Sequence, residues 1–270
     1  MLRLTTHILR RQFPSWDRAS QVAFVIGTVL LLVFLVLTVT ASADDRPTLL
    51  ALAGAVLLVT QGVVLWANRG MVTPVAKAQR AYLSEDYDSV IQLLEPSAAR
   101  AELDAKGWML LGSAYRQLNR FDRSVTALEN ALRIEPNHHF SLYNFGRTLL
   151  VQGDYAAAVP YFEAALQAGA PEALRADLAE ALYRMGEEAA ALTQMHQVQS
   201  VLSDDPARRV WVELTRFQLG DGAPPDQRLI RAGLPYWVAT AERFQHTPYG
   251  AALRQEIATM TSFLPDQGEY

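Results

Sequence analysis

The strongest constraint in this sequence is a set of apolar and small residues that recurs every 34 positions. The residues related by this spacing are Tyr87, Phe121 and Tyr155; Leu94, Leu128 and Phe162; Leu111 and Phe145; Gly112 and Gly146; and Ala131 and Ala165. A fixed period of this length is typical of stacked supersecondary units, because one unit cannot bury its apolar face without its neighbours. The sequence therefore predicts a solenoid of repeats.

Each repeat is predicted to contain two antiparallel helices. We expect the two helices of a unit to cross closely at Gly112 and Gly146, and the small residues Ala131 and Ala165 to serve similar crossings. Pro136 is expected to end a second helix, because proline cannot continue the hydrogen-bond ladder. The units are placed at 71–104, 105–138, 139–172 and 173–205.

The first and fourth units depart from the pattern of the two middle ones. Ala81 stands in the first unit where an aromatic residue is expected, and Pro96 is expected to cut its second helix short. The fourth unit carries alanine where the middle units have glycine. Terminal repeats of an array are often atypical, because one of their faces meets no further repeat.

The second unit contains the pattern W-x-x-L-G-x-x-Y at Trp108, Leu111, Gly112 and Tyr115. This pattern resembles the tetratricopeptide repeat, and the resemblance covers residues 71–205, half of the chain. It implies an all-α solenoid of helix pairs. The residues that it assigns to packing between helices are Trp108, Leu111, Gly112, Tyr115, Phe121, Ala131, Pro136, Phe145, Gly146, Tyr155, Phe162 and Ala165.

The resemblance also implies a concave groove, lined by the first helix of each unit, that binds an extended peptide or a partner helix. Tyr143 and Arg147 are expected to be exposed there, and Arg116 and Arg147 either favour an acidic ligand or are solvated. Where chaperone-binding members of the family carry a carboxylate clamp, this chain has Met109 and Ser113, so that clamp is predicted to be absent. The expected groove residues are Gln79, Tyr82, Met109, Ser113, Arg116, Tyr143, Asn144, Arg147 and Tyr183.

Two stretches before the repeats, Ala19–Ala43 and Pro47–Asn68, contain no charged residue. A helix needs roughly 20 apolar residues to cross the hydrocarbon core of a bilayer. Helices of a soluble core usually carry a polar stripe, which these stretches lack. We therefore expect two transmembrane helices, at about 21–42 and 48–67. The alternative, a signal peptide cleaved after Ala43, requires an apolar run of only about 7–15 residues.

The charges around these stretches predict their orientation. Arginines precede the first stretch, and the connecting loop is Asp44-Asp45-Arg46. Because basic flanks stay on the cytoplasmic side, we expect a multi-pass protein of the inner cell membrane with both termini in the cytoplasm. Residues 1–18 form a basic cytoplasmic tail, which is either a short interfacial helix or a frayed segment.

The short loop forces the two apolar helices into an antiparallel hairpin. Gly27 in the first helix and Gly54 and Gly62 in the second are expected to let the two backbones approach closely. Gln61, an amide within the second helix, is expected to hydrogen-bond to the partner helix. Its alternative role is to bind another membrane protein.

Residues 206–270 keep a helical pattern but lose the 34-residue period. The segment after Pro206 is expected to form half of a fifth unit. Further helices are predicted at about 225–233, 235–246 and 248–263, with Pro235 and Pro248 at their boundaries. These helices either cap the last repeat or present a separate surface to a partner.

The composition excludes several functions. The chain has no cysteine, so it has neither a disulfide framework nor a thiolate metal site. Residues 71–270 carry 18 basic and 25 acidic side chains, which argues against nucleic acid as a partner. No catalytic, cofactor-binding or metal-binding motif is present, so we expect no enzyme.

Two functions are compatible with these features. The chain is expected to be a membrane-tethered scaffold that binds proteins at the cytoplasmic membrane face, as an adaptor or assembly factor for a membrane complex. The alternative is a regulatory subunit that contacts a membrane enzyme or transporter through its transmembrane hairpin.

Overall fold

The computed structural model describes residues 18–68 and 73–265. These residues form α-helices and short 3-10 turns, and none of them lies in a strand. They divide into two compact units, residues 1–73 and 74–270, which are treated separately below. The expected basic tail, residues 1–18, lies outside the described residues except for Arg18, which begins the first helix.

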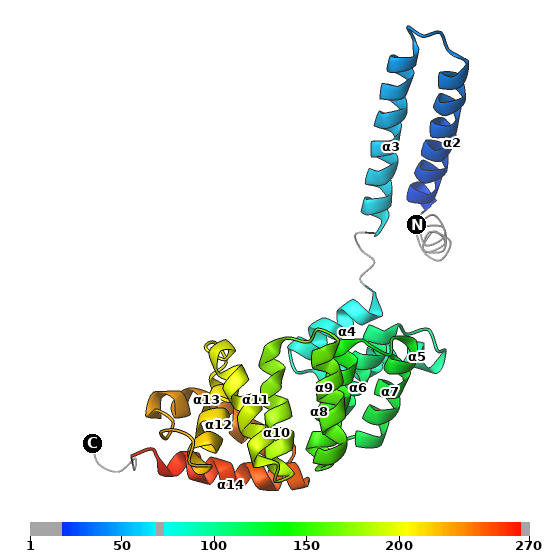
Figure 1. Ribbon diagram of the computed structural model, residues 1–270. Helices are drawn as coiled ribbons and strands as arrows, with labels where there is room; N and C mark the ends of the chain where they lie inside the picture. The colour runs from blue at the N-terminus through cyan, green and yellow to red at the C-terminus, as the bar shows by residue number, and fades with distance from the viewer. Residues whose placement is uncertain (1–17, 69–72, 266–270) are drawn as a thin grey trace. The chain divides into compact units, whose positions relative to one another are not determined.

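The first unit is a hairpin of two helices, α2 (Arg18–Thr40) and α3 (Arg46–Asn68). Figure 1 shows them side by side and joined by a short turn. The helix over residues 18–40 has a mean hydropathy of 3.0 and the span Arg46–Trp66 one of 2.2, so both are long and apolar enough to cross a membrane.

The contact between α2 and α3 differs from the prediction at two glycines. A Cβ atom added at Gly27 would collide with the Thr60 hydroxyl, whereas at Gly54 and Gly62 it would meet nothing within 4 Å. Ala53 and Thr60 are the buried residues of α3, so its contact face is rotated away from Gly54 and Gly62. Gln61 is exposed on α3.

The second unit begins with four consecutive helix pairs (Figure 1). We call the first helix of each pair an A helix and the second a B helix. The A helices are α4 (Pro74–Leu83), α6 (Ala105–Gln117), α8 (His139–Gln152) and α10 (Arg175–Arg184). The B helices are α5 (Tyr87–Ala99), α7 (Phe121–Ile134), α9 (Tyr155–Gln167) and α11 (Glu188–Val198).

Local sequence signals explain where these helices begin and end. The side chains of Asp86, Asp104 and Asp154 accept hydrogen bonds from backbone N–H groups in the first turns of α5, α6 and α9. Such N-caps satisfy donors that would otherwise have no partner. Gly153 ends α8 in the left-handed conformation, with φ at 88°, which glycine adopts without strain.

The helices of the two middle pairs cross at the repeating glycines. A Cβ atom at Gly112 would lie 2.7 Å from Leu128 Cγ, and one at Gly146 would lie 2.8 Å from Phe162 Cε1. Ala131 and Leu128 on α7 are fully buried. Glycine at these positions therefore lets each A helix approach its B helix.

Two of the proline predictions are wrong. α5 continues past Pro96 to Ala99, and residues 227–243 form one helix that passes through Pro235. Both prolines are exposed, so their missing N–H groups face no buried acceptor. Buried residues on either side, such as Leu94 before Pro96 and Trp237 after Pro235, anchor the flanking turns.

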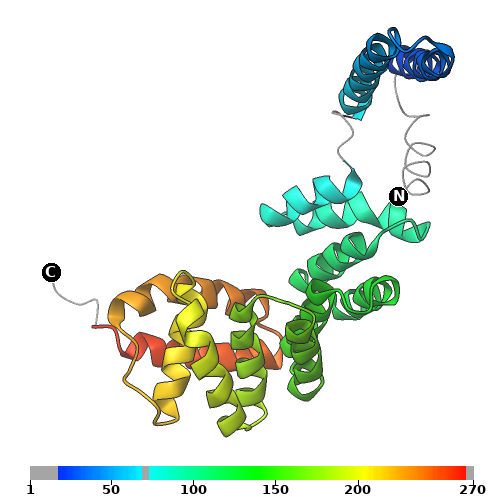
Figure 2. The same cartoon turned by 45° about the horizontal axis from the view of Figure 1, so that its top comes forward.

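Three helices follow the pairs: α12 (Pro206–Gln218), α13 (Gln227–Arg243) and α14 (Pro248–Ser262). In both views α14 begins near α8 and runs alongside α10–α12 (Figures 1 and 2). Ile230, Trp237, Tyr249 and Leu253 belong to the same buried core as Phe162 of the third pair. The C-terminal helices therefore cap the repeats, and their contacts extend back to α8.

Candidate functional site

The A helices α4, α6 and α8 present one common face, which we call the A-helix face. Side-chain hydrogen bonds join α6 to α8 across it. Ser113 Oγ donates to Asn144 Oδ1 at 2.9 Å, and Arg116 donates to Asn144 O at 3.0 Å and to Asn144 Oδ1 at 3.1 Å. Asn144 is thus the acceptor that fixes the two helices in register.

Beyond Asn144, the same face becomes a buried ion cluster. Arg147 Nη1 lies 2.7 Å from Asp177 Oδ1, and Arg208 Nη2 lies 3.1 Å from Asp177 Oδ2. Arg208 also donates to the Tyr143 hydroxyl at 3.2 Å. Burial alone would raise the pKa of Asp177, but the charges of Arg208 and Arg147 outweigh it and hold this pKa below 3.8.

The expectation that Arg147 is exposed is wrong. Arg147 is 9% exposed and Arg116 is 5% exposed, so neither is a solvated charge. The physical reason is that Asp177 of α10 and Arg208 of α12 complete a cluster around Arg147. Among the described residues Arg116 forms no ion pair, and burial lowers the pKa of its guanidinium.

The remaining predicted groove residues differ in accessibility. Gln79 is exposed, whereas Tyr82, Met109, Tyr143 and Asn144 are half-buried. Ser113 is buried at 2% exposure. The accessible part of the A-helix face therefore lies on α4, α6 and the start of α8.

Tyr183 is separated from this set. It lies at the end of α10, where it lines a cavity of about 490 Å³ together with Tyr155, Arg184 and Glu256. Arg184 pairs there with Glu256 of α14 at 3.2 Å. Burial raises the pKa of Glu256 despite this partner. The predicted groove residues therefore lie in two separate places, with Tyr183 at this cavity and the others on the A-helix face.

Sequence reasoning missed the contribution of α13. Tyr236 lines a small cavity together with Arg147 and Asp177, and it remains 49% exposed. At the end of α13, Arg243 donates to Gln117 Oε1 at 3.1 Å and pairs with Glu85 at 2.6 Å. The aromatic pair at 236–237 was visible in the sequence, but no periodic signal linked it to the A helices.

Comparisons with known proteins agree with this architecture. Two family models described as tetratricopeptide repeat match residues 105–138 and 143–195. Tetratricopeptide repeat protein 21B of Mus musculus is 34% identical over 80 residues, and its Homo sapiens counterpart is 32% identical over 80 residues. Each alignment covers 30% of this chain and only 6% of the relative.

A solved structure of a thermophilic tetratricopeptide repeat protein from Thermus thermophilus is similar to this fold. Its TM-score is 0.50 at 15% identity, and the match covers 70% of this chain and 98% of the other. The stacked helix pairs define an α-solenoid of repeats. Residues 105–138 and 143–195 are therefore tetratricopeptide repeats, a type of repeat that typically serves as a non-enzymatic scaffold for protein interactions.

Proposed function

We propose that this scaffold is tethered to a membrane by α2 and α3 and gathers protein partners at the cytoplasmic face, as an adaptor or assembly factor for a membrane complex. One observation carries the proposal: the apolar side chains of both helices are uncovered. Leu32 is 59% exposed, Val36 65% and Leu58 74%. A contiguous apolar surface of this kind is costly in water and favourable in lipid.

The proposed partner surface is the accessible part of the A-helix face. Tyr82, Met109 and Asn144 contribute there from α4, α6 and α8, and Tyr236 is the exposed aromatic residue of α13. Tyrosine is enriched among residues that dominate binding energy, because its ring buries apolar area while its hydroxyl keeps a hydrogen bond. A peptide or helix is the proposed ligand.

A second candidate is a regulatory subunit that recognises its target within the membrane. Gly54 and Gly62 favour it, because both lie on α3 where nothing approaches within 4 Å. Small residues on a helix let a further membrane helix pack closely.

The topology is tested with phosphatase fusions. A fusion after Tyr270 should be inactive and an insertion at residues 44–46 should be active, because the arginine-rich flank is expected to stay inside. The reverse pattern would move the repeats to the outer side of the membrane.

The partner surface is tested by photocrosslinking in native membranes. A photoreactive residue at Met109 should capture a protein, whereas one at the exposed Gln197 of α11 serves as the control. Capture from Gly62 but not from Met109 would favour the regulatory subunit.

A further inference from the structure

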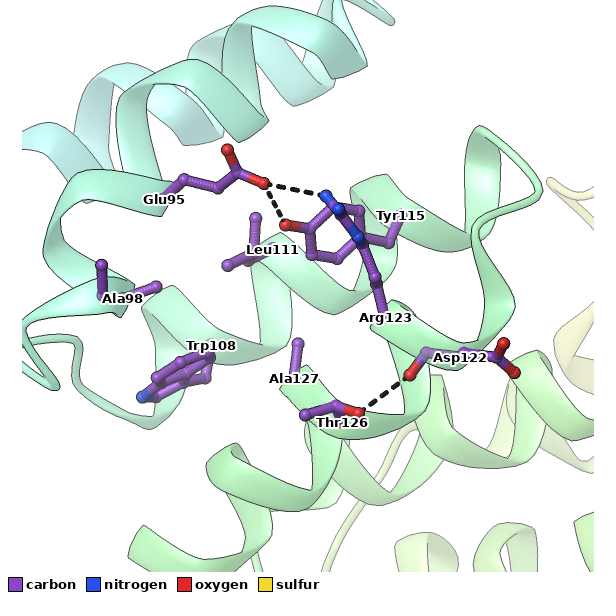
Figure 3. Close-up of a pocket in the computed structure, with 10 residues that line it drawn as sticks. Glu95, Ala98, Trp108, Leu111, Tyr115, Asp122, Arg123, Thr126 and Ala127 are labelled. Carbon is purple, nitrogen blue, oxygen red and sulfur yellow. Dashed lines mark hydrogen bonds and ion pairs between the residues drawn. The ribbon is translucent and has the colours of Figure 1, made fainter.

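A cavity of about 560 Å³ opens between the first two repeats, at a place that the proposed function does not use. The B helices α5 and α7 form its sides and α6 forms its floor (Figure 3). Its apolar lining includes Ala98 from α5, Trp108 and Leu111 from α6, and Ala127 from α7. We call this cavity the first crevice.

One end of the first crevice is polar. Tyr115 donates to Glu95 Oε1 at 2.5 Å, and Arg123 Nη1 lies 3.3 Å from the same oxygen (Figure 3). Burial and the hydrogen bond to Glu95 raise the pKa of Tyr115 to about 12. Asp122 lines the same crevice and, among the described residues, has no ion pair. The lining therefore carries two carboxylates and one guanidinium.

The repeat itself shows what fits such a space. Advancing by 34 positions replaces Ala98 with Leu132 and Ala127 with Tyr161. At the equivalent place between α7 and α9, which we call the second crevice, both large side chains pack against a cluster of the buried residues Leu142, Ala165 and Ala170. Tyr161 stacks there on Phe145, with ring centroids 4.3 Å apart. The volume that a leucine and a tyrosine fill in the second crevice is left open in the first by two alanines.

We propose that the first crevice binds a helix of a partner protein, which inserts a leucine or aromatic side chain between α5 and α7. The apolar floor of Trp108 and Leu111 accepts that side chain, as Phe145 accepts Tyr161 in the second crevice. A lysine or arginine beside the inserted residue meets Asp122, because the lining has an excess of negative charge. The scaffold then holds two partners, one on the A-helix face and one in this crevice.

The first experiment identifies what enters the crevice. A photoreactive residue replaces Ala99, which is exposed and lines the cavity, in the full chain in native membranes. The captured segment should contain a leucine or aromatic residue next to a lysine or arginine. Capture of lipid alone, of a second copy of this chain, of a segment without these residues, or of nothing would overturn the proposal.

The second experiment titrates a synthetic peptide of the captured segment against the full chain in lipid nanodiscs. Ala98→Leu restores the side chain of the second crevice, so it should weaken binding at least tenfold and raise the melting temperature. Asp122→Lys should also weaken binding, without a packing change, because Asp122 is exposed. Equal affinities of the wild type and both variants would refute the proposal that the peptide binds in the first crevice.

Matched controls separate this site from the A-helix face. Ala189→Leu adds the same side chain at an exposed position of α11 and should leave the peptide affinity unchanged. Tyr82→Ala should also leave it unchanged if the crevice is the binding site. A loss of peptide affinity with Tyr82→Ala, but not with Ala98→Leu, would assign the peptide to the A-helix face. That result would refute the crevice proposal and leave the proposed scaffold function unaffected.

Discussion

The two ends of the repeat array bury charge and apolar surface very differently. In α4–α7 the ion pair between Arg123 and Glu95 lies at the surface, where the two side chains are 63% and 45% exposed. In α8–α14 the pair between Arg147 and Asp177 is buried, at 11% and 4%. The C-terminal helices also share one core with the third and fourth pairs. The later helices therefore bury their ion pair and share one core, whereas the first two repeats leave their ion pair at the surface.

The largest effect is expected at Asp177. Asp177→Asn removes the carboxylate that pairs with the buried guanidinium of Arg147, which among the described residues keeps only Glu180 at 3.8 Å, and breaking a buried pair in this way costs about 3–5 kcal/mol. Urea unfolding of the fragment 74–270, a compact unit of its own, measures this loss. A loss of unfolding free energy below about 1 kcal/mol is what a surface ion pair gives, so it would contradict the difference between the two ends of the array.

Overpacking of the helix crossings should have an intermediate effect. Gly112→Leu and Gly146→Leu each place a side chain where a Cβ atom already meets Leu128 or Phe162, so both should lose about 1–3 kcal/mol. Gly146→Leu is expected to lose more, because Phe162 lies within the continuous core. Melting temperatures check this order, and Ala156→Leu at an exposed position of α9 should change little.

Acid should reduce the contribution of Asp177 to the stability of the fold. Its folded pKa lies below the ordinary value of 3.8, so its stabilising contribution is fully present above that value and is lost as the pH falls through the folded pKa. The difference in unfolding free energy between the wild type and Asp177→Asn should therefore shrink below about pH 4. A constant difference between pH 3 and pH 7 would assign the effect of the variant to packing.

The smallest effect is expected at Glu95. Because the side chains of Glu95 and Arg123 keep 45% and 63% of their surface exposed, Glu95→Gln should cost less than about 1 kcal/mol. The amide oxygen can still accept the hydrogen bond from Tyr115. A loss comparable to that of Asp177→Asn would show that the first two repeats depend on this pair as the last ones depend on theirs.

The repeat packing was predictable from the sequence because it is periodic. Gly112 and Gly146 meet partners within their own helix pairs, so one spacing of 34 residues locates both contacts. The buried cluster was not predictable in the same way. Arg147 finds Asp177 in the next pair and Asp177 finds Arg208 in α12, and neither partner repeats elsewhere with the period. Exposure of Arg147 was therefore inferred from the family groove alone.

The helix through Pro235 shows a second limit of sequence reasoning. Proline predicts a boundary from local backbone chemistry. Here the helix continues through Pro235, because Ile230 and Trp237 on either side of it are both buried in the shared core and hold the two halves of α13 in place. That core is assembled from segments far apart in the sequence, so a local pattern does not contain it.

The contact between Arg243 and the first repeat bears on how the molecule unfolds. Arg243 pairs with Glu85, 158 positions earlier, and its backbone oxygen accepts a hydrogen bond from Asn119 at 2.8 Å. A plain repeat array interacts only with nearest neighbours and can lose its ends one unit at a time. Here α13 joins the first repeat to the last helices, so fraying of α4 and α5 also breaks contacts of the C-terminal core. The array should unfold with the cooperativity of a globular domain, and it should fold more slowly than its local helix pairs alone would allow.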